Sequence, residues 1–121
     1  MQRIRILLAE MPPLLRDVFR QVITDQPDME VVGELTGAVG LLMAAGQSHA
    51  DVVILGLHDP EFPGIGTHLL SEYPHLKILG VTVDGRQAFL HELRPHRLPL
   101  GEASPAGLLD AIRAAIRTRA L

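Results

Sequence analysis

Histidines are the residues of this chain whose side chains most readily suggest chemistry, and the chain has six of them. His91, Glu92 and His96 are close in sequence, as are His58 and His68, so metal binding is the first chemistry to consider. No pair has the H-E-x-x-H spacing that puts two ligands on one face of a helix, and a proline ends any helix before His96. We therefore predict no metal ligands here and interpret the histidines as scattered surface residues.

The composition excludes several other kinds of chemistry. There is no cysteine, so disulfides, thiolate zinc sites and a cysteine nucleophile are excluded. The net charge of -3 and an aromatic content of 3% do not fit a protein that binds nucleic acid by itself. With 121 residues, 47% of them hydrophobic, we expect one domain covering residues 1–121. No apolar run approaches the roughly 18 residues of a membrane helix, and no signal peptide is evident, so we expect a cytoplasmic protein.

Short apolar segments alternate with helical patterns along the whole chain. Apolar segments at residues 4–9, 29–35, 52–55 and 77–83 predict buried strands, and residues 98–100 predict a weak fifth strand. Helical patterns follow each segment. One begins at Pro13, the second covers residues 37–47 with Thr36 as its cap, and the third and fourth cover 65–72 and 87–94. Ser104 and Pro105 open the last helix.

This alternation predicts an α/β fold. Strands that are apolar on both faces and separated by helices form a parallel sheet covered on both sides. We therefore expect a flavodoxin-like, CheY-like (βα)5 three-layer sandwich with the parallel strand order 2-1-3-4-5. In that order the fifth strand is an edge, where Pro99 is tolerated.

The sequence resembles bacterial response-regulator receiver domains, in particular those of the NarL/FixJ type. The resemblance covers nearly the whole chain and is carried by the stretches RIRILLAEMPPLLRDVF, PDMEVVGEL, ADVVILGLHDPEFPGIG, LKILGVT and EASPAGLLDAIRAAI. Within them, PD-x-EVVGE and ASP-x-x-LL-x-AIR are similar to the family in detail. The resemblance implies a two-component signalling protein of bacteria in which an aspartate accepts a phosphoryl group beside Mg²⁺.

Most of the positions that carry this chemistry in the family are changed. The resemblance places the acidic pair on Glu10 and Met11, the acceptor aspartate on Gly56, the hydroxyl on Thr82 and the lysine on Gly101. Glycine has no side-chain oxygen, so it cannot be the nucleophile of phosphoryl transfer. One remaining carboxylate is a poor site for Mg²⁺, which requires octahedral oxygen coordination. We therefore expect a pseudo-receiver with no catalytic residues, no enzymatic activity and weak or absent Mg²⁺ binding.

Two alternatives retain a chemical role for the same edge of the sheet. Asp59, close to Gly56 in the chain, is a possible substitute phosphoacceptor, although Asp59-Pro60 is also a common opening of a turn. The vacated pocket could instead bind a small molecule. Against that, Met11 could simply fill the space, and Thr82 could be a β-branched residue that suits a strand end.

The expected partners are proteins. The first helix has two apolar columns, Leu14/Val18/Val22 and Leu15/Phe19/Ile23, and part of this wide surface could stay exposed for a partner or a second copy. The resemblance implies a transcription regulator whose DNA contacts come from a helix-turn-helix domain. These 121 residues contain none, so direct DNA binding by this chain is not expected.

Overall fold

A computed structural model describes residues 3–57, 64–92, 97–99 and 104–119 of the chain. These residues form six strands and four helices, in the following order: β1 (Ile4–Ala9), α1 (Pro13–Thr24), β2 (Met29–Leu35), α2 (Ala38–Gln47), β3 (Val52–Leu57), α3 (Gly64–Glu72), β4 (Lys77–Thr82), β5 (Ala88–His91), β6 (Arg97–Pro99) and α4 (Pro105–Arg119).

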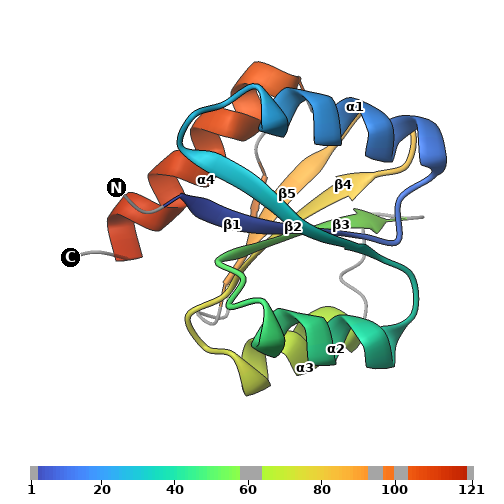
Figure 1. Ribbon diagram of the computed structural model, residues 1–121, viewed down its shortest axis with the longest axis vertical. Helices are drawn as coiled ribbons and strands as arrows, with labels where there is room; N and C mark the ends of the chain where they lie inside the picture. The colour runs from blue at the N-terminus through green and yellow to red at the C-terminus, as the bar shows by residue number, and fades with distance from the viewer. Residues whose placement is uncertain (1–2, 58–63, 93–96, 100–103, 120–121) are drawn as a thin grey trace.

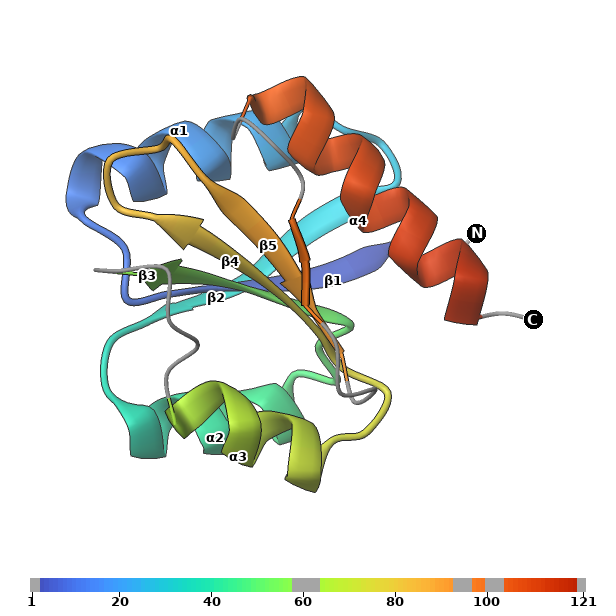
Figure 2. The same ribbon diagram turned by 180° about the vertical axis from the view of Figure 1, so that it is seen from behind.

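The strands form one sheet with the order β2-β1-β3-β4-β5-β6. The pairs among β1, β2, β3 and β4 are parallel. Helices α1 and α4 cover one face, and α2 and α3 cover the other (Figures 1 and 2). The predicted α/β class, its three layers and the CheY-like order 2-1-3-4-5 are therefore confirmed.

The helix predicted over residues 87–94 is wrong. Residues 88–91 are strand β5, which pairs antiparallel with β4, and β6 pairs antiparallel with β5. The sheet therefore ends in two antiparallel strands in place of a fourth βα unit. The cause is the Asp84-Gly85 turn, in which Gly85 has φ 74°, because such a turn joins neighbouring strands directly. Pro99 does lie in an edge strand, as predicted.

Two apolar cores hold the layers together. The first lies between the sheet and α1 with α4, and it includes Ile6, Leu8, Phe19 and Ile112. The second lies between the sheet and α2 with α3. All six residues of β3 are buried, because this central strand has a helical layer on each face.

The helix starts agree with the sequence except at α2. Pro13 is the first residue of α1. The Ser104 hydroxyl accepts a hydrogen bond from the Gly107 backbone N–H at 3.2 Å, as expected of a cap. The predicted Thr36 cap is wrong, because the residue at the cap position of α2 is Gly37, with φ 92°. Glycine has no side chain that could cap the helix.

The two apolar columns of α1 are buried to different extents, and Val22 of the first column packs against the core. Phe19 and Ile23 lie in the core, whereas Leu14 and Val18 have 79% and 43% of their surface exposed. The prediction that part of this wide apolar surface stays exposed is confirmed. Among the described residues, no helix is both long enough and apolar enough to cross a lipid bilayer.

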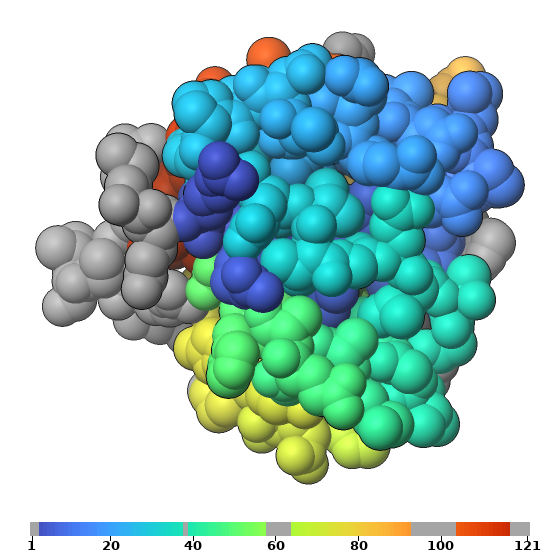
Figure 3. All heavy atoms as spheres, viewed as in Figure 1, coloured from blue at the N-terminus to red at the C-terminus, as the bar shows by residue number. Residues whose placement is uncertain are grey.

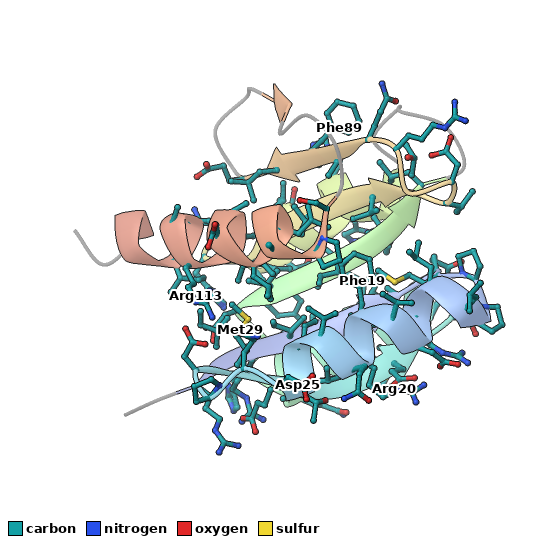
Figure 4. The ribbon with its side chains drawn as sticks, turned by 90° about the horizontal axis from the view of Figure 1, so that it is seen from above. Phe19, Arg20, Asp25, Met29, Phe89 and Arg113 are labelled. Carbon is teal, nitrogen blue, oxygen red and sulfur yellow. The ribbon has the colours of Figure 1, made fainter. Side chains whose placement is uncertain are left out.

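Arg113 joins α4 to the segment between α1 and β2. Its guanidinium donates to both Asp28 carboxylate oxygens, at 2.8 and 3.0 Å, and to Gln26 Oε1 at 2.7 Å. In Figure 4 it lies beside Met29, while Phe19 points into the layer between α1 and α4. The contact is partly buried, since the side chains of Arg113 and Asp28 are 26% and 31% exposed.

We expect Arg113→Leu to lower the free energy of unfolding by about 1–2 kcal/mol, because charged hydrogen bonds of limited exposure are lost. The measurement is urea denaturation. The matched control is Asp110→Ala, because Asp110 is 82% exposed and lies 3.8 Å from Arg113. Equal effects of the two substitutions would show that the bond to Asp28 contributes little.

Candidate functional site

The predicted site positions meet at the carboxyl ends of the central strands. Glu10 and Met11 directly follow β1, and Gly56 lies inside β3, next to Val81 of β4 in register. Thr82 is the last residue of β4 and pairs with Leu57. The structure thus brings Glu10, Met11, Gly56 and Thr82 to one edge of the sheet. Two further predicted site residues, Gly101 and Asp59, lie outside the described residues.

The main chain after β1 crosses directly over Gly56. A Cβ atom at position 56 would lie 3.0 Å from the Glu10 carbonyl carbon, 3.3 Å from Met11 Cα and closer still to the Glu10 carbonyl oxygen. These are backbone atoms, which cannot rotate away as a flexible side chain can. The space that an acceptor side chain would need at position 56 is therefore filled by the chain itself.

Glu10 holds this crossing segment in place. Its backbone has φ 58°, a left-handed conformation that non-glycine residues adopt only when their surroundings enforce it. Its N–H donates to the Leu35 carbonyl at 3.1 Å, and its carboxylate accepts from the Gly37 N–H at 2.5 Å. The Glu10 carboxylate therefore bonds to the backbone just before α2, the position where the sequence suggested Thr36 as a cap.

Met11 belongs to the core. It is 7% exposed and packs in the cluster that contains Leu8 and Phe19. The prediction that Met11 fills space at this edge agrees with this burial, because the flexible thioether suits an irregular gap.

Thr82 is bound into the turn between β4 and β5. Its hydroxyl donates to Asp84 Oδ1 at 2.6 Å and accepts from the Gln87 N–H at 3.0 Å. Asp84 also accepts from the Arg86 N–H at 2.9 Å. Both capacities of the hydroxyl are thus used within the hairpin, which favours the structural role for Thr82.

This turn makes stability depend on pH. The hydrogen bond from Thr82, followed by that from the Arg86 backbone, holds the pKa of Asp84 below its ordinary value. A carboxyl whose pKa is lower in the folded state stabilises the fold above the unfolded pKa, and this contribution is lost as pH falls through the folded pKa. We expect the stability difference between wild type and Asp84→Asn to shrink as pH falls below about 4. Urea denaturation across the acid range measures it, and a constant difference would contradict the assignment.

The remaining predicted chemical groups are dispersed. His68 is exposed on α3, and His58 and His96 lie outside the described residues. His91 is buried in β5, 5% exposed, so the prediction that the histidines are surface residues is wrong for this one. Lys77 lies at the opposite end of β4 from Thr82, and its amine contacts Glu92 at 2.8 Å. Among the described residues, no three histidine, aspartate or glutamate side chains are grouped so as to hold a metal ion.

A cavity of about 140 Å³ lies beside Met11. Its lining residues come from β1, β2 and α1 and from the segments next to them, whereas Gly56 lies on β3. Arg16 and Glu34 line it together with the apolar side chains of Leu8 and Leu35. Glu34 is held by Arg20, whose guanidinium donates to both carboxylate oxygens at 2.6 and 3.1 Å. Only Met11 is shared with the predicted site, and sequence reasoning did not identify Arg16 or Glu34.

Comparisons with known proteins agree with this fold. No family model matches the chain. An uncharacterized transcriptional regulatory protein of Bacillus subtilis, YxjL, is 34% identical over 124 residues, a match that covers 98% of this chain and 57% of the relative. The response regulator domain of Thermotoga maritima CheB superposes with a TM-score of 0.66 at 21% identity, covering 96% of this chain and 98% of that one. The response regulator RcsB of Salmonella typhimurium superposes with a TM-score of 0.57 at 21% identity, covering 68% and 44%.

The chain has the fold of response-regulator receiver domains and is similar in sequence to a transcriptional regulatory protein of Bacillus subtilis. The sequence resemblance to this family is confirmed. The chain spans little more than half the length of that relative.

Proposed function

We propose that this chain is a regulatory and interaction module of a transcription regulator that works without phosphorylation at the usual receiver position and without enzymatic activity. The observation that carries the proposal is the passage of the Glu10 main chain over Gly56. The usual position thus lacks an acceptor oxygen, and it also lacks the volume that an acceptor side chain would occupy.

The groups around this position do not fit a magnesium ion. Mg²⁺ requires several oxygen ligands in octahedral geometry. The Glu10 carboxylate is engaged with Gly37, and Met11 contributes an apolar side chain within the core. Phosphoryl transfer needs the positive charge of such a metal ion beside the acceptor. We therefore expect no phosphoryl transfer at this edge of the sheet.

Protein partners, including a second copy of the chain, follow from the same proposal. One solved relative is a complex of RcsB dimers with DNA. For the present chain, contact with DNA would come from a separate helix-turn-helix domain of the regulator. In a phosphorylatable receiver, the phosphoryl group shifts the equilibrium between two conformations. A module that is not phosphorylated lacks this shift, so it would contact its partners constitutively.

The proposal is tested with a phosphoryl mimic. Amide spectra of the ¹⁵N-labelled chain are recorded while Mg²⁺ and then beryllofluoride are added. We expect no saturable shifts at Glu10, Met11, Gly56 or Thr82. Saturable shifts that cluster on these residues would overturn the proposal. Shifts that cluster on Asp59 would support the substitute-acceptor hypothesis instead.

The cavity beside Met11 favours a second candidate, a small-molecule sensor. Arg16 supplies a cation, whose Nε also lies 3.3 Å from Glu34 Oε1, and Leu8 and Leu35 supply apolar contact. A small carboxylate that replaces Glu34 beside Arg16 is therefore the class of ligand that fits. Acetate and propionate are suitable probes in a ligand-observed NMR experiment. Binding that is lost in Arg16→Met would support the sensor, and equal signals in both proteins would exclude this cavity as its site.

A further inference from the structure

Strand β2 forms an open edge of the sheet, because β1 is the only strand among the described residues that pairs with it. It has seven residues and no proline, whereas β6 at the other edge has three residues and contains Pro99. Short length and proline protect an edge from pairing with a further strand, and β2 has neither feature. Figure 3 shows β2, in cyan, in the middle of one face of the molecule, between α1 above it and α2 below it.

The backbone groups of Val31 point away from β1. The Asp28 carbonyl accepts from the Ile4 N–H at 2.8 Å, so the backbone at Asp28 faces β1. Successive residues of a strand direct their backbone groups to opposite sides, so Met29 and Val31 direct theirs outward. The pairing with β1 shifts register just after Val31, which interrupts the alternation. Residues 29–31 are therefore the part of β2 that offers outward N–H and C=O groups in regular strand geometry.

A hollow of about 320 Å³ borders the same part of β2. Its lining includes residues of β2, of α1 and of the segment before β1: Met29, Glu30, Val31, Glu34, Arg20 and Arg3. Every second side chain of an added strand would face α1, so one of these side chains would lie in the hollow. The hollow is distinct from the cavity beside Met11, since only Glu34 lines both.

The charges that line the hollow favour an acidic side chain. Glu34 accepts two hydrogen bonds from the Arg20 guanidinium, at 2.6 and 3.1 Å, and Glu30 accepts one from the Arg5 guanidinium at 2.7 Å. Charged residues protect a strand edge, but these two carboxylates are already paired within the molecule. Arg3 is exposed and has no carboxylate partner among the described residues. Its guanidinium is therefore the group that a carboxylate of a ligand would complement.

We propose that residues 29–31 bind an extended acidic segment of a partner protein as a further strand of the sheet. The main chain of that segment bonds to the outward groups of Met29 and Val31, and one of its carboxylates pairs with Arg3. In this mode of binding the main-chain hydrogen bonds provide affinity, and the pocket for a side chain provides specificity. This deepens the proposed function, on which it rests, by giving the chemistry of the partner.

The first test uses an acetylated and amidated peptide of sequence Thr-Val-Glu-Val-Thr, and the same peptide with Lys in place of Glu. Each is titrated to millimolar concentration into the ¹⁵N-labelled chain. We expect the acidic peptide to give saturable amide shifts at Arg3, Met29 and Val31. The basic peptide is expected to bind at least about tenfold more weakly, because it brings a second cation to Arg3. Absence of saturable shifts at β2 with the acidic peptide, or equal affinities of the two peptides, overturns the proposal.

Two variants test the two contacts separately. Val31→Pro removes the outward N–H, and proline is tolerated where the N–H side of an edge strand faces solvent, so the fold should persist while binding is lost. Arg3→Glu reverses the charge at an exposed position and is expected to reverse the preference between the two peptides. The matched control is Arg86→Glu, at an exposed position in the turn between β4 and β5, which should leave the preference unchanged. Equal effects of Arg3→Glu and Arg86→Glu contradict the proposal.

Acetate distinguishes an added strand from a simple anion at Arg3. We expect acetate alone to leave the amide shifts of Met29 and Val31 unchanged, because it has no main chain to pair with the edge. If acetate reproduces the shifts caused by the acidic peptide, the ligand is a free anion and the proposal is wrong. None of these results bears on phosphorylation at the carboxyl ends of the strands, so failure of this proposal and failure of the proposed function are distinguishable.

Discussion

Gly56→Ala is expected to lower the free energy of unfolding by about 3 kcal/mol, the upper part of the usual range for overpacking. The physical reason is the backbone contact between a Cβ atom at position 56 and Glu10. Relief would require movement of the segment after β1, which is held by the bonds from Glu10 to Leu35 and Gly37. Urea denaturation at low protein concentration measures the loss.

The matched control is Gly40→Ala. It adds the same methyl group to a glycine with no neighbour within 4 Å and is expected to stabilise the monomer by about 1 kcal/mol. The two substitutions should therefore differ in sign. If Gly56→Ala were neutral, the Glu10 segment would be free to move, and the closed site would not be a fixed feature of the fold.

The same argument predicts the behaviour of Gly56→Asp. This substitution restores the acceptor carboxylate but adds the same Cβ atom, and it introduces a charge into a buried strand. We expect a protein at least as destabilised as Gly56→Ala, without normal phosphorylation by a small phosphodonor. Normal phosphorylation of this single variant would show that the second acidic residue, replaced by Met11, and the lysine, replaced by Gly101, are not required.

Met11→Asp is expected to lower the free energy of unfolding by about 3–5 kcal/mol at neutral pH, because it places a carboxylate in the core beside Leu8 and Phe19. Burial would raise the pKa of this new carboxyl in the folded state. Stability relative to wild type should therefore recover as pH falls through the raised pKa and decrease as pH rises. Denaturation at several pH values measures this slope.

Met11→Leu is the control for volume, since exchanges that conserve volume in a core cost less than about 1.5 kcal/mol. It should show no added pH dependence. A stable Met11→Asp variant that binds Mg²⁺ with Glu10 would contradict the placement of Met11 in the core and the engagement of Glu10 with Gly37.

The sequence was sufficient for the framework of this fold. Short apolar segments bounded by turn residues predict β1, β2 and β4 closely. Most residues of β1 and β4 are buried, as expected of strands covered on both faces. It also located Gly56 at the edge where an acceptor would lie. Absence of a side-chain oxygen can be read directly from the residue type, whereas occupation of the space by another segment cannot.

The end of the sheet could not be predicted in the same way. Residues 88–91 form too short an apolar segment for its periodicity to separate a helix from a strand. The Asp84-Gly85 dipeptide was the available signal for a hairpin. The left-handed backbone of Glu10 had no comparable signal, because it depends on the hydrogen bond that the Gly37 N–H, 27 positions further along the chain, donates to the Glu10 carboxylate.

The most direct measurement of the central claim is the intact mass of the chain after incubation with Mg²⁺ and acetyl phosphate. The account predicts an unchanged mass under conditions in which a receiver with an aspartate at the acceptor position becomes phosphorylated. A gain of one phosphoryl group would contradict it, and peptide mapping would then locate the acyl phosphate, with Asp59 the first position to examine.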